Sequence, residues 1–109
     1  MRELVLKNRI AQIKINGSVY DILMSDYEIT EMADAVREKC KDIKASHTKA
    51  VAEAAQFVAD CIERMIGDGA VAAIANGKPV GVCTLLEWFW QIVNTAYAAH
   101  FDRLVEEND

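Results

Sequence analysis

The longest regular pattern in this chain is a series of apolar positions spaced alternately four and three residues apart. The series is Ile29, Ala33, Val36, Cys40, Ile43, His47, Val51, Ala54, Val58, Cys61 and Met65, with one four-four step around His47. Such spacing lines one face of an α-helix. Because residues 25–66 contain no glycine or proline, we expect a single helix of about 40 residues, roughly 60 Å long. The alternative is two helices, with a break at residues 45–48 and Thr48 as the cap of the second.

Residues 10–23, before this helix, predict a β-hairpin. Asn16-Gly17 is the dipeptide most typical of a two-residue type I′ turn, which needs a positive φ at both central positions. The turn sets the register, and the residues on one face are then Ala11, Ile13, Ile15, Ser18, Tyr20 and Ile22. A lone hairpin is marginal in water, so we expect this mostly apolar face to cover helices or to meet another chain.

Two Ser/Thr-x-x-Glu sequences predict where helices begin. In such a capping box, each of the two residues satisfies a backbone N–H of the other. Ser25 with Glu28 is expected to start the long helix, and Thr84 with Glu87 is expected to start the last one, over residues 85–106.

A glycine-rich stretch between these helices is expected to act as a hinge. Gly67 ends the long helix in the left-handed conformation, and Asp68 caps a short helix over residues 69–75 that begins at Gly69. Gly77, after Asn76, closes the short helix, and Pro79 prevents its continuation. The Gly-Asp-Gly sequence lacks the Gly-Lys-Ser/Thr ending of a phosphate-binding loop, so we interpret it as a helix stop and restart.

The last predicted helix is apolar on more than one side. One stripe contains Leu85, Phe89, Ile92, Val93 and Ala96, and the neighbouring stripe contains Leu86, Trp90, Tyr97, Phe101 and Leu104. Trp88 projects from a further sector, because residues two apart on a helix cannot face the same core. A helix of this kind is buried in several directions. We therefore take Trp88, Trp90, Tyr97 and Phe101 as candidate partner-binding residues and expect a homo-oligomer.

Composition fits a single domain over residues 1–109, mainly α-helical with a small N-terminal β-hairpin. The acidic residues 106–109 are expected to form a frayed tail. A net charge of −5 argues against nucleic-acid binding, which normally uses a basic face. The Lys-rich residues 37–49 are interrupted by Glu38 and Asp42 and fit a solvated helix face. Polar residues within residues 82–101 favour a buried helix over a membrane span.

No spacing of residues predicts catalysis, a metal site or a cofactor. Cys40, Cys61 and Cys83 are odd in number and far apart in sequence, which argues against a disulfide framework and for a reducing compartment. The start of the chain lacks the apolar segment of a secretory signal. We expect a protein that is not an enzyme, and a thiol enzyme using Cys61 or Cys83 is the weakest hypothesis.

The order of elements, and the stretch Ile66-Gly67-Asp68-Gly69 leading into an alanine-rich helix that ends at Ile74, resemble the tail assembly chaperones of long-tailed bacteriophages of Gram-positive hosts. In that family an apolar-Gly-acidic-Gly stretch precedes a short helix, and a loop and a closing helix follow. The resemblance implies a cytoplasmic protein of the host cell that binds and solubilises the tape measure protein and helps to recruit tail tube subunits. It brings no residue-level binding motif that can be placed on this sequence, and we expect no cofactor. The alternative is a small helical DNA-associated regulatory protein from a mobile element, which residues 37–49 suggest.

Overall fold

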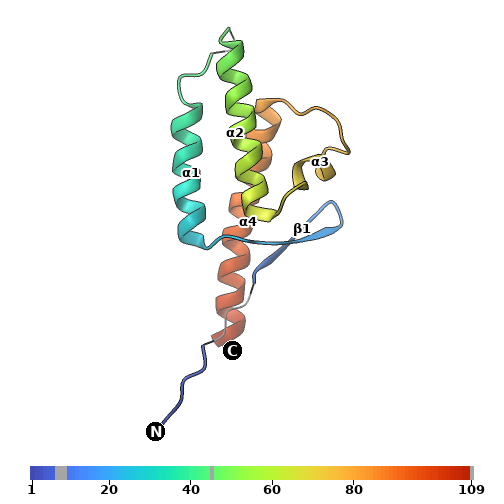
Figure 1. Ribbon diagram of the computed structural model, residues 1–109. Coiled ribbons are helices and arrows are strands. Elements are labelled where there is room, and N and C mark those ends of the chain that lie inside the picture. The colour runs from blue at the N-terminus through green and yellow to red at the C-terminus, as the bar shows by residue number, and fades with distance from the viewer. Residues whose placement is uncertain (7–9, 45, 109) are drawn as a thin grey trace.

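The computed structural model describes residues 1–6, 10–44 and 46–108, with side chains as far as residue 102. Its elements are the strands β1 (Gln12–Ile15) and β2 (Ser18–Asp21) and the helices α1 (Asp26–Cys40), α2 (Thr48–Ile66), α3 (Ala70–Ile74) and α4 (Val82–Asn108). The mainly α fold with an N-terminal hairpin, predicted from the sequence, is confirmed. Figure 1 shows α1, α2 and α4 side by side, with the hairpin and α3 on one side of this bundle.

The hairpin has the predicted register. Ile15 pairs with Ser18 and Ile13 with Tyr20, and the Ile22 N–H donates to the Ala11 carbonyl over 2.8 Å. The turn residues Asn16 and Gly17 have φ values of 49° and 87°, as a type I′ turn requires. Ala11, Ile13 and Ile22 are buried, whereas Gln12, Lys14, Val19 and Asp21 are exposed. The apolar face therefore covers the helices of its own chain.

The prediction of one helix over residues 25–66 is wrong, and the two-helix alternative is closer to the structure. α1 ends at Cys40, Asp42 adopts a left-handed φ of 62°, and α2 begins at Thr48. Thr48 is the first helical residue rather than the cap, which is His47. Folding back at this point lets the apolar residues of the two halves bury each other. Ile29 and Val36 of α1 lie in the same core cluster as Val58 and Ile62 of α2.

The chain crosses the bundle three times. α1 runs one way, α2 returns, and the segment through α3 carries the chain back so that α4 runs in the direction of α2 (Figure 1). α4 packs against α1, α2 and β1. Its Phe89 is fully buried at the centre of the core, together with Ile29, Val36, Val58, Ile62 and Met65. Among the described residues, no buried side chain is polar or charged, so apolar packing holds this fold together.

One of the two capping boxes is confirmed. The Ser25 hydroxyl accepts from the Glu28 N–H over 3.2 Å, and the Glu28 carboxylate accepts from the Ser25 N–H over the same distance. The predicted cap at Thr84 and Glu87 is wrong, because α4 already begins at Val82. The Gly81 carbonyl accepts the first hydrogen bond of α4, from the Leu85 N–H over 3.0 Å. Thr84 and Glu87 therefore lie within the first two turns of this helix.

The hinge is built around Gly69 rather than Asp68. Gly67 follows α2 with φ 117° and ψ 153°, which is not the predicted left-handed helical conformation. Gly69 has that conformation, and it is the cap of α3 in place of Asp68. The Gly69 N–H donates to a Glu63 carboxylate oxygen over 2.9 Å. Asn76 and Gly77 close α3 with positive φ values, as predicted, and the segment containing Pro79 then leads to α4.

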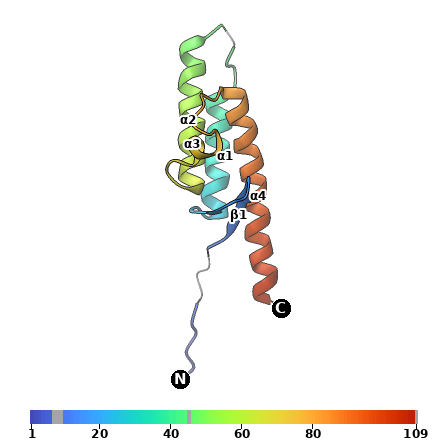
Figure 2. The ribbon, with the colours of Figure 1, turned by 90° about the vertical axis from the view of Figure 1, so that its right-hand side faces the viewer.

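The molecule is elongated, with extents of 65 × 29 × 19 Å. Figure 2 shows the end of α4 and the N-terminal segment extending past the same end of the bundle. α4 continues to Asn108, so residues 106–108, predicted as a frayed tail, belong to its last turn, and Asp109 lies outside the described residues.

None of the helices in the described part of the chain has the length and apolar character needed to cross a membrane.

Candidate functional site

The four candidate partner-binding residues of α4 divide into two groups. Trp90 and Tyr97 hold α4 against α1: the Arg37 guanidinium carbon lies 4.7 Å from the centroid of the Trp90 ring, and the Tyr97 hydroxyl is hydrogen-bonded to the Thr30 hydroxyl. Both aromatic side chains are half-buried. Their apolar surface is therefore largely used inside the chain. Trp88 is half-buried as well, so of the four candidates only Phe101 has a mostly exposed side chain, and partner binding by these residues stays a prediction.

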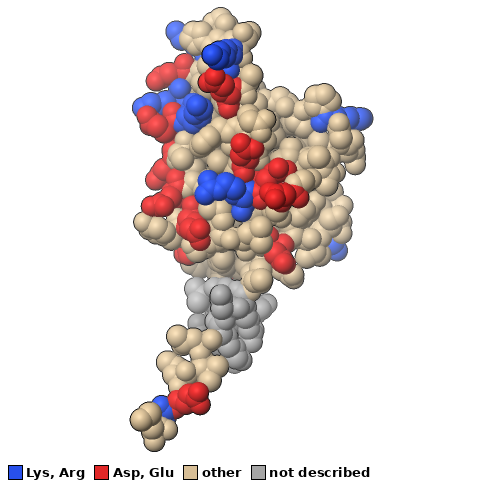
Figure 3. All heavy atoms as spheres, viewed as in Figure 1, with Lys and Arg blue, Asp and Glu red and all other residues tan. Residues whose placement is uncertain are grey.

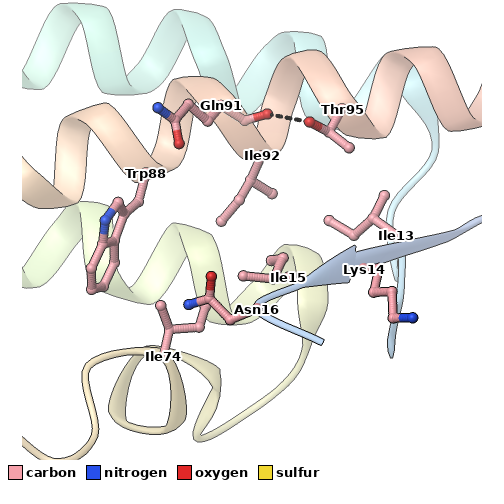
Figure 4. A pocket seen from close by; sticks show the side chains of 9 residues that line it. All are labelled: Ile13, Lys14, Ile15, Asn16, Ile74, Trp88, Gln91, Ile92 and Thr95. Carbon is pink, nitrogen blue, oxygen red and sulfur yellow. Dashed lines mark hydrogen bonds between the residues drawn. The ribbon is translucent and has the colours of Figure 1, made fainter. Parts of the chain in front are cut away.

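Trp88 faces away from Trp90, as predicted, and lines a groove between β1, α3 and α4. We call this the hairpin groove; its lining residues are Ile13, Lys14, Ile15, Asn16, Ile74, Trp88, Gln91, Ile92 and Thr95, and its volume is about 320 Å³. In Figure 4, Ile13 and Ile15 point toward α4, whereas Lys14 points away. The groove is open, and its lining combines the apolar side chains of Ile13, Ile15, Ile74, Trp88 and Ile92 with four polar residues, a combination that suits a peptide segment better than a small polar ligand.

Phe101 is the most exposed of the four candidates, with 66% of its surface accessible. Phe101 belongs to the C-terminal part of α4, and the C-terminal end of this helix extends beyond the bundle (Figure 1). The neighbouring His100 anchors this part of the helix, because one of its ring nitrogens lies 3.1 Å from the Met24 carbonyl oxygen. Phe101 is therefore available for contact with another molecule.

A second groove, which we did not predict, lies between α2 and the segment from α3 to the start of α4. We call it the alanine groove; it has a volume of about 490 Å³ and is lined by Ala52, Ala55, Gln56, Ala59, Asp60, Glu63, Val71, Ala72, Ala75, Gly77, Lys78, Val80 and Leu85. Its α2 side is a row of small residues: Ala52 is exposed, and Ala55 and Ala59 are half-buried. These alanines are spaced three and four residues apart and lie on the helix face next to the buried residues of α2. This second, alanine-lined face is the sequence pattern that could have indicated the groove.

The two walls of the alanine groove carry opposite charges. Asp60 and Glu63 lie on the α2 wall and Lys78 on the other. Asp60 accepts a hydrogen bond from the Gln56 amide over 2.8 Å, and Glu63 accepts from the Gly69 N–H. Both carboxylates lie on the α2 wall, so a ligand with positive charge on that side would be favoured there.

Two of the three thiols, those of Cys40 and Cys61, are poorly suited to nucleophilic catalysis. Burial raises the pKa of Cys40, an effect that the nearby charge of Lys39 opposes. Burial also raises the pKa of Cys61, with Arg64 opposing it and Asp60 adding to it. A raised pKa keeps a thiol protonated and unreactive at neutral pH. Cys83 is exposed. In the described part of the chain, no three His, Cys, Asp or Glu residues are placed to hold a metal ion.

The Lys-rich stretch lies around the turn between α1 and α2. Lys41 there pairs with Glu38 over 2.9 Å, and Arg37 pairs with Asp34 over 3.0 Å. Figure 3 shows acidic and basic side chains intermingled at this end of the molecule. Such a mixed surface lacks the continuous positive field that attracts nucleic acid, so it adds no support for the DNA-associated alternative.

Comparisons of this chain with protein-family models, with curated proteins and with solved structures find no match.

Proposed function

We propose that this protein is a non-enzymatic assembly chaperone of phage or prophage tails, which acts in the cytoplasm of the host bacterium. It holds a helical segment of the tape measure protein in the alanine groove and keeps that protein soluble while tail tube subunits are recruited. The observation that carries the proposal is the groove itself: an open, apolar channel along α2 whose floor is made of small side chains.

Small residues allow a second helix to approach closely. The distance between two packed helix axes is about 8–10 Å and is set by the side chains at the contact. The row of alanines along α2 faces Ala72 of α3 and Ala75, the residue after α3, on the opposite wall, and leaves the space that larger client side chains would fill. Recognition of an amphipathic helix in such a groove needs no catalytic group and no cofactor.

The charges of the groove predict the orientation of the client. Asp60 and Glu63 favour Lys or Arg on the side of the client helix that meets α2, and Lys78 favours an acidic residue on the other side. The net charge of −5 helps to keep a protein with exposed apolar surface soluble.

The proposal is tested by filling the groove. Ala52→Tyr and Ala72→Tyr place bulky side chains on opposite walls at exposed positions. The matched control is Ala35→Tyr, at an exposed position on α1 outside the groove. The coding sequences near this chain are searched for a tape measure protein, each variant is co-expressed with that protein, and the soluble fraction of that client is measured.

We expect the native chain and Ala35→Tyr to keep the client soluble and the two groove variants to lower its soluble fraction several-fold. An equal effect of all three tyrosines would contradict binding in the alanine groove. The absence of any tape measure gene near the coding sequence, or no solubilisation by the native chain, would contradict the chaperone function.

A further inference from the structure

We propose that residues 2–6 of one copy of this chain add as a third strand to the free edge of β1 in a second copy, with Leu4 and Leu6 seated in the hairpin groove. This contact goes beyond the proposed function and uses a different groove from the one proposed for the client helix. Either can therefore fail without the other.

The free edge of β1 carries unpaired backbone groups beside the hairpin groove. In this register, Ile13 and Ile15 exchange hydrogen bonds with β2, so the N–H and C=O groups of Gln12 and Lys14 point away from it. Within the described residues, neither group makes a backbone hydrogen bond outside the hairpin. An open edge of this kind is a template for another strand, and Lys14 also lines the groove.

The N-terminal segment supplies a strand that its own domain leaves in water. Leu4, Val5 and Leu6 are 80%, 74% and 82% exposed. Figures 1 and 2 show this segment leading away from the domain. Burying the exposed side chains of Leu4 and Leu6 against a partner is favourable, and the second copy offers the apolar side chains of the hairpin groove beside a strand edge.

One antiparallel register of residues 2–6 against β1 places Leu4 and Leu6 toward the hairpin groove and an acidic residue near Lys14. With Val5 opposite Lys14, Leu4 lies opposite Ile15 and Leu6 opposite Ile13. Because side chains alternate along a strand, Leu4 and Leu6 then share the sheet face of Ile13 and Ile15, toward Trp88 and Ile92 of the groove.

On the other face of the same register, Val5 lies with Lys14 toward solvent. Glu3 occupies the diagonal position to Lys14, within reach of an ion pair. The segment thus presents its acidic residue to the charged residue of the groove lining.

A second copy accepts this segment more readily than the chain's own hairpin does. Pairing in the same register within one chain would require residues 7–10 to reverse direction. Among these residues only Asn8 readily adopts a positive φ, whereas the common two-residue type I′ turn needs it at both central positions. A segment from another copy needs no such reversal.

The test compares the molar mass of full-length variants by light scattering over a range of concentrations. Leu4→Ser with Leu6→Ser removes the groove-facing side chains, and Val5→Ser is the matched control on the solvent-facing side. Lys14→Pro removes an N–H of the free edge but no hydrogen bond between β1 and β2. Circular dichroism confirms that each variant keeps its helical content.

We expect the native chain and Val5→Ser to exceed the mass of a single chain as concentration rises, with dissociation constants within about threefold of each other. The double serine variant and Lys14→Pro alone should each weaken association at least tenfold. Mixed together, these two should form a one-to-one complex, because one retains the acceptor edge and the other retains the donor segment.

Three outcomes would overturn the proposal: a native chain that stays monomeric at all concentrations, a Val5→Ser variant that dissociates as readily as the double variant, or defective variants that do not complement on mixing. The last outcome would mean that the segment pairs within its own chain or that copies adhere through another surface.

Discussion

The guanidinium of Arg37 on α1 lies over the ring of Trp90 on α4, with 4.7 Å between the guanidinium carbon and the ring centroid. A residue of the first helix thus covers an aromatic side chain of the last helix. Together with the hydrogen bond between Thr30 and Tyr97, this contact joins α1 and α4 along the outside of the bundle.

Removing the Arg37 side chain should lower the free energy of unfolding by about 1 kcal/mol, because a cation–π contact and the packing of the Arg stem over the ring are lost. Arg37→Lys should lose less, since it keeps the charge. Urea unfolding followed by tryptophan fluorescence measures both. Arg64→Ala, at an exposed position on α2, is the control and should change stability by less than about 0.5 kcal/mol. Equal effects at the two arginines would contradict the contact.

Ser25→Ala and Thr84→Ala should differ, although the two positions have the same local sequence pattern. Ser25 caps α1 through its hydroxyl, and loss of such a cap costs about 1 kcal/mol. Thr84 lies inside α4, where replacement by alanine removes no cap and improves helix propensity. Thermal unfolding of the two variants compares them directly. A larger loss at Thr84 would mean that α4 begins later than the structure has it.

Gly69 should tolerate asparagine better than alanine. Its φ of 82° and ψ of −2° are left-handed, a conformation that costs most residues about 1–2 kcal/mol and asparagine less. No heavy atom beyond its chain neighbours lies within 4 Å of the position that a Cβ would occupy, so the cost should come from the backbone alone. We expect stability to decrease from glycine to asparagine to alanine in urea unfolding. The reverse order of the two variants would rule out this conformation at residue 69.

The three thiols should react at different rates with a neutral disulfide reagent. Cys83 is exposed and should react first, whereas Cys61 is buried and its raised pKa keeps it protonated. Because the folded pKa of Cys61 lies above its unfolded value, the associated stability is fully present below the ordinary thiol pKa and is lost as pH rises through the folded pKa. Cys61→Ser should therefore flatten the alkaline decline in stability. A Cys61 that reacts as fast as Cys83 in the native protein would contradict its burial.

Elements that depend on neighbouring residues were predictable from the sequence. The Asn16-Gly17 turn sets the strand register by itself, and Ser25 with Glu28 forms a cap without help from distant residues. The buried stripe of α4, from Leu85 to Ala96, also followed from helical spacing.

Features that depend on how distant segments meet were not predictable in the same way. The apolar series from Ile29 to Met65 has the same spacing in one long helix as in two helices folded back on each other. The two-helix arrangement is favoured because it buries Val36 and Val58 in one core, and the free energy of that burial does not follow from the spacing. The alanine groove likewise exists because α3 and residues 77–80 lie beside α2, an arrangement that no local pattern specifies.

The position of Phe89 has a consequence for how the protein is made. This fully buried residue belongs to α4, which packs against α1, α2 and β1. As a ribosome makes the chain, the hairpin and the first three helices emerge before the helix that closes their shared core. Until Leu85 to Ala96, which include the buried residues of α4 in the described part of the chain, have left the ribosome, these elements lack the helix that covers their apolar faces. A protein proposed to shield another chain from aggregation thus needs protection itself until its last helix has been made.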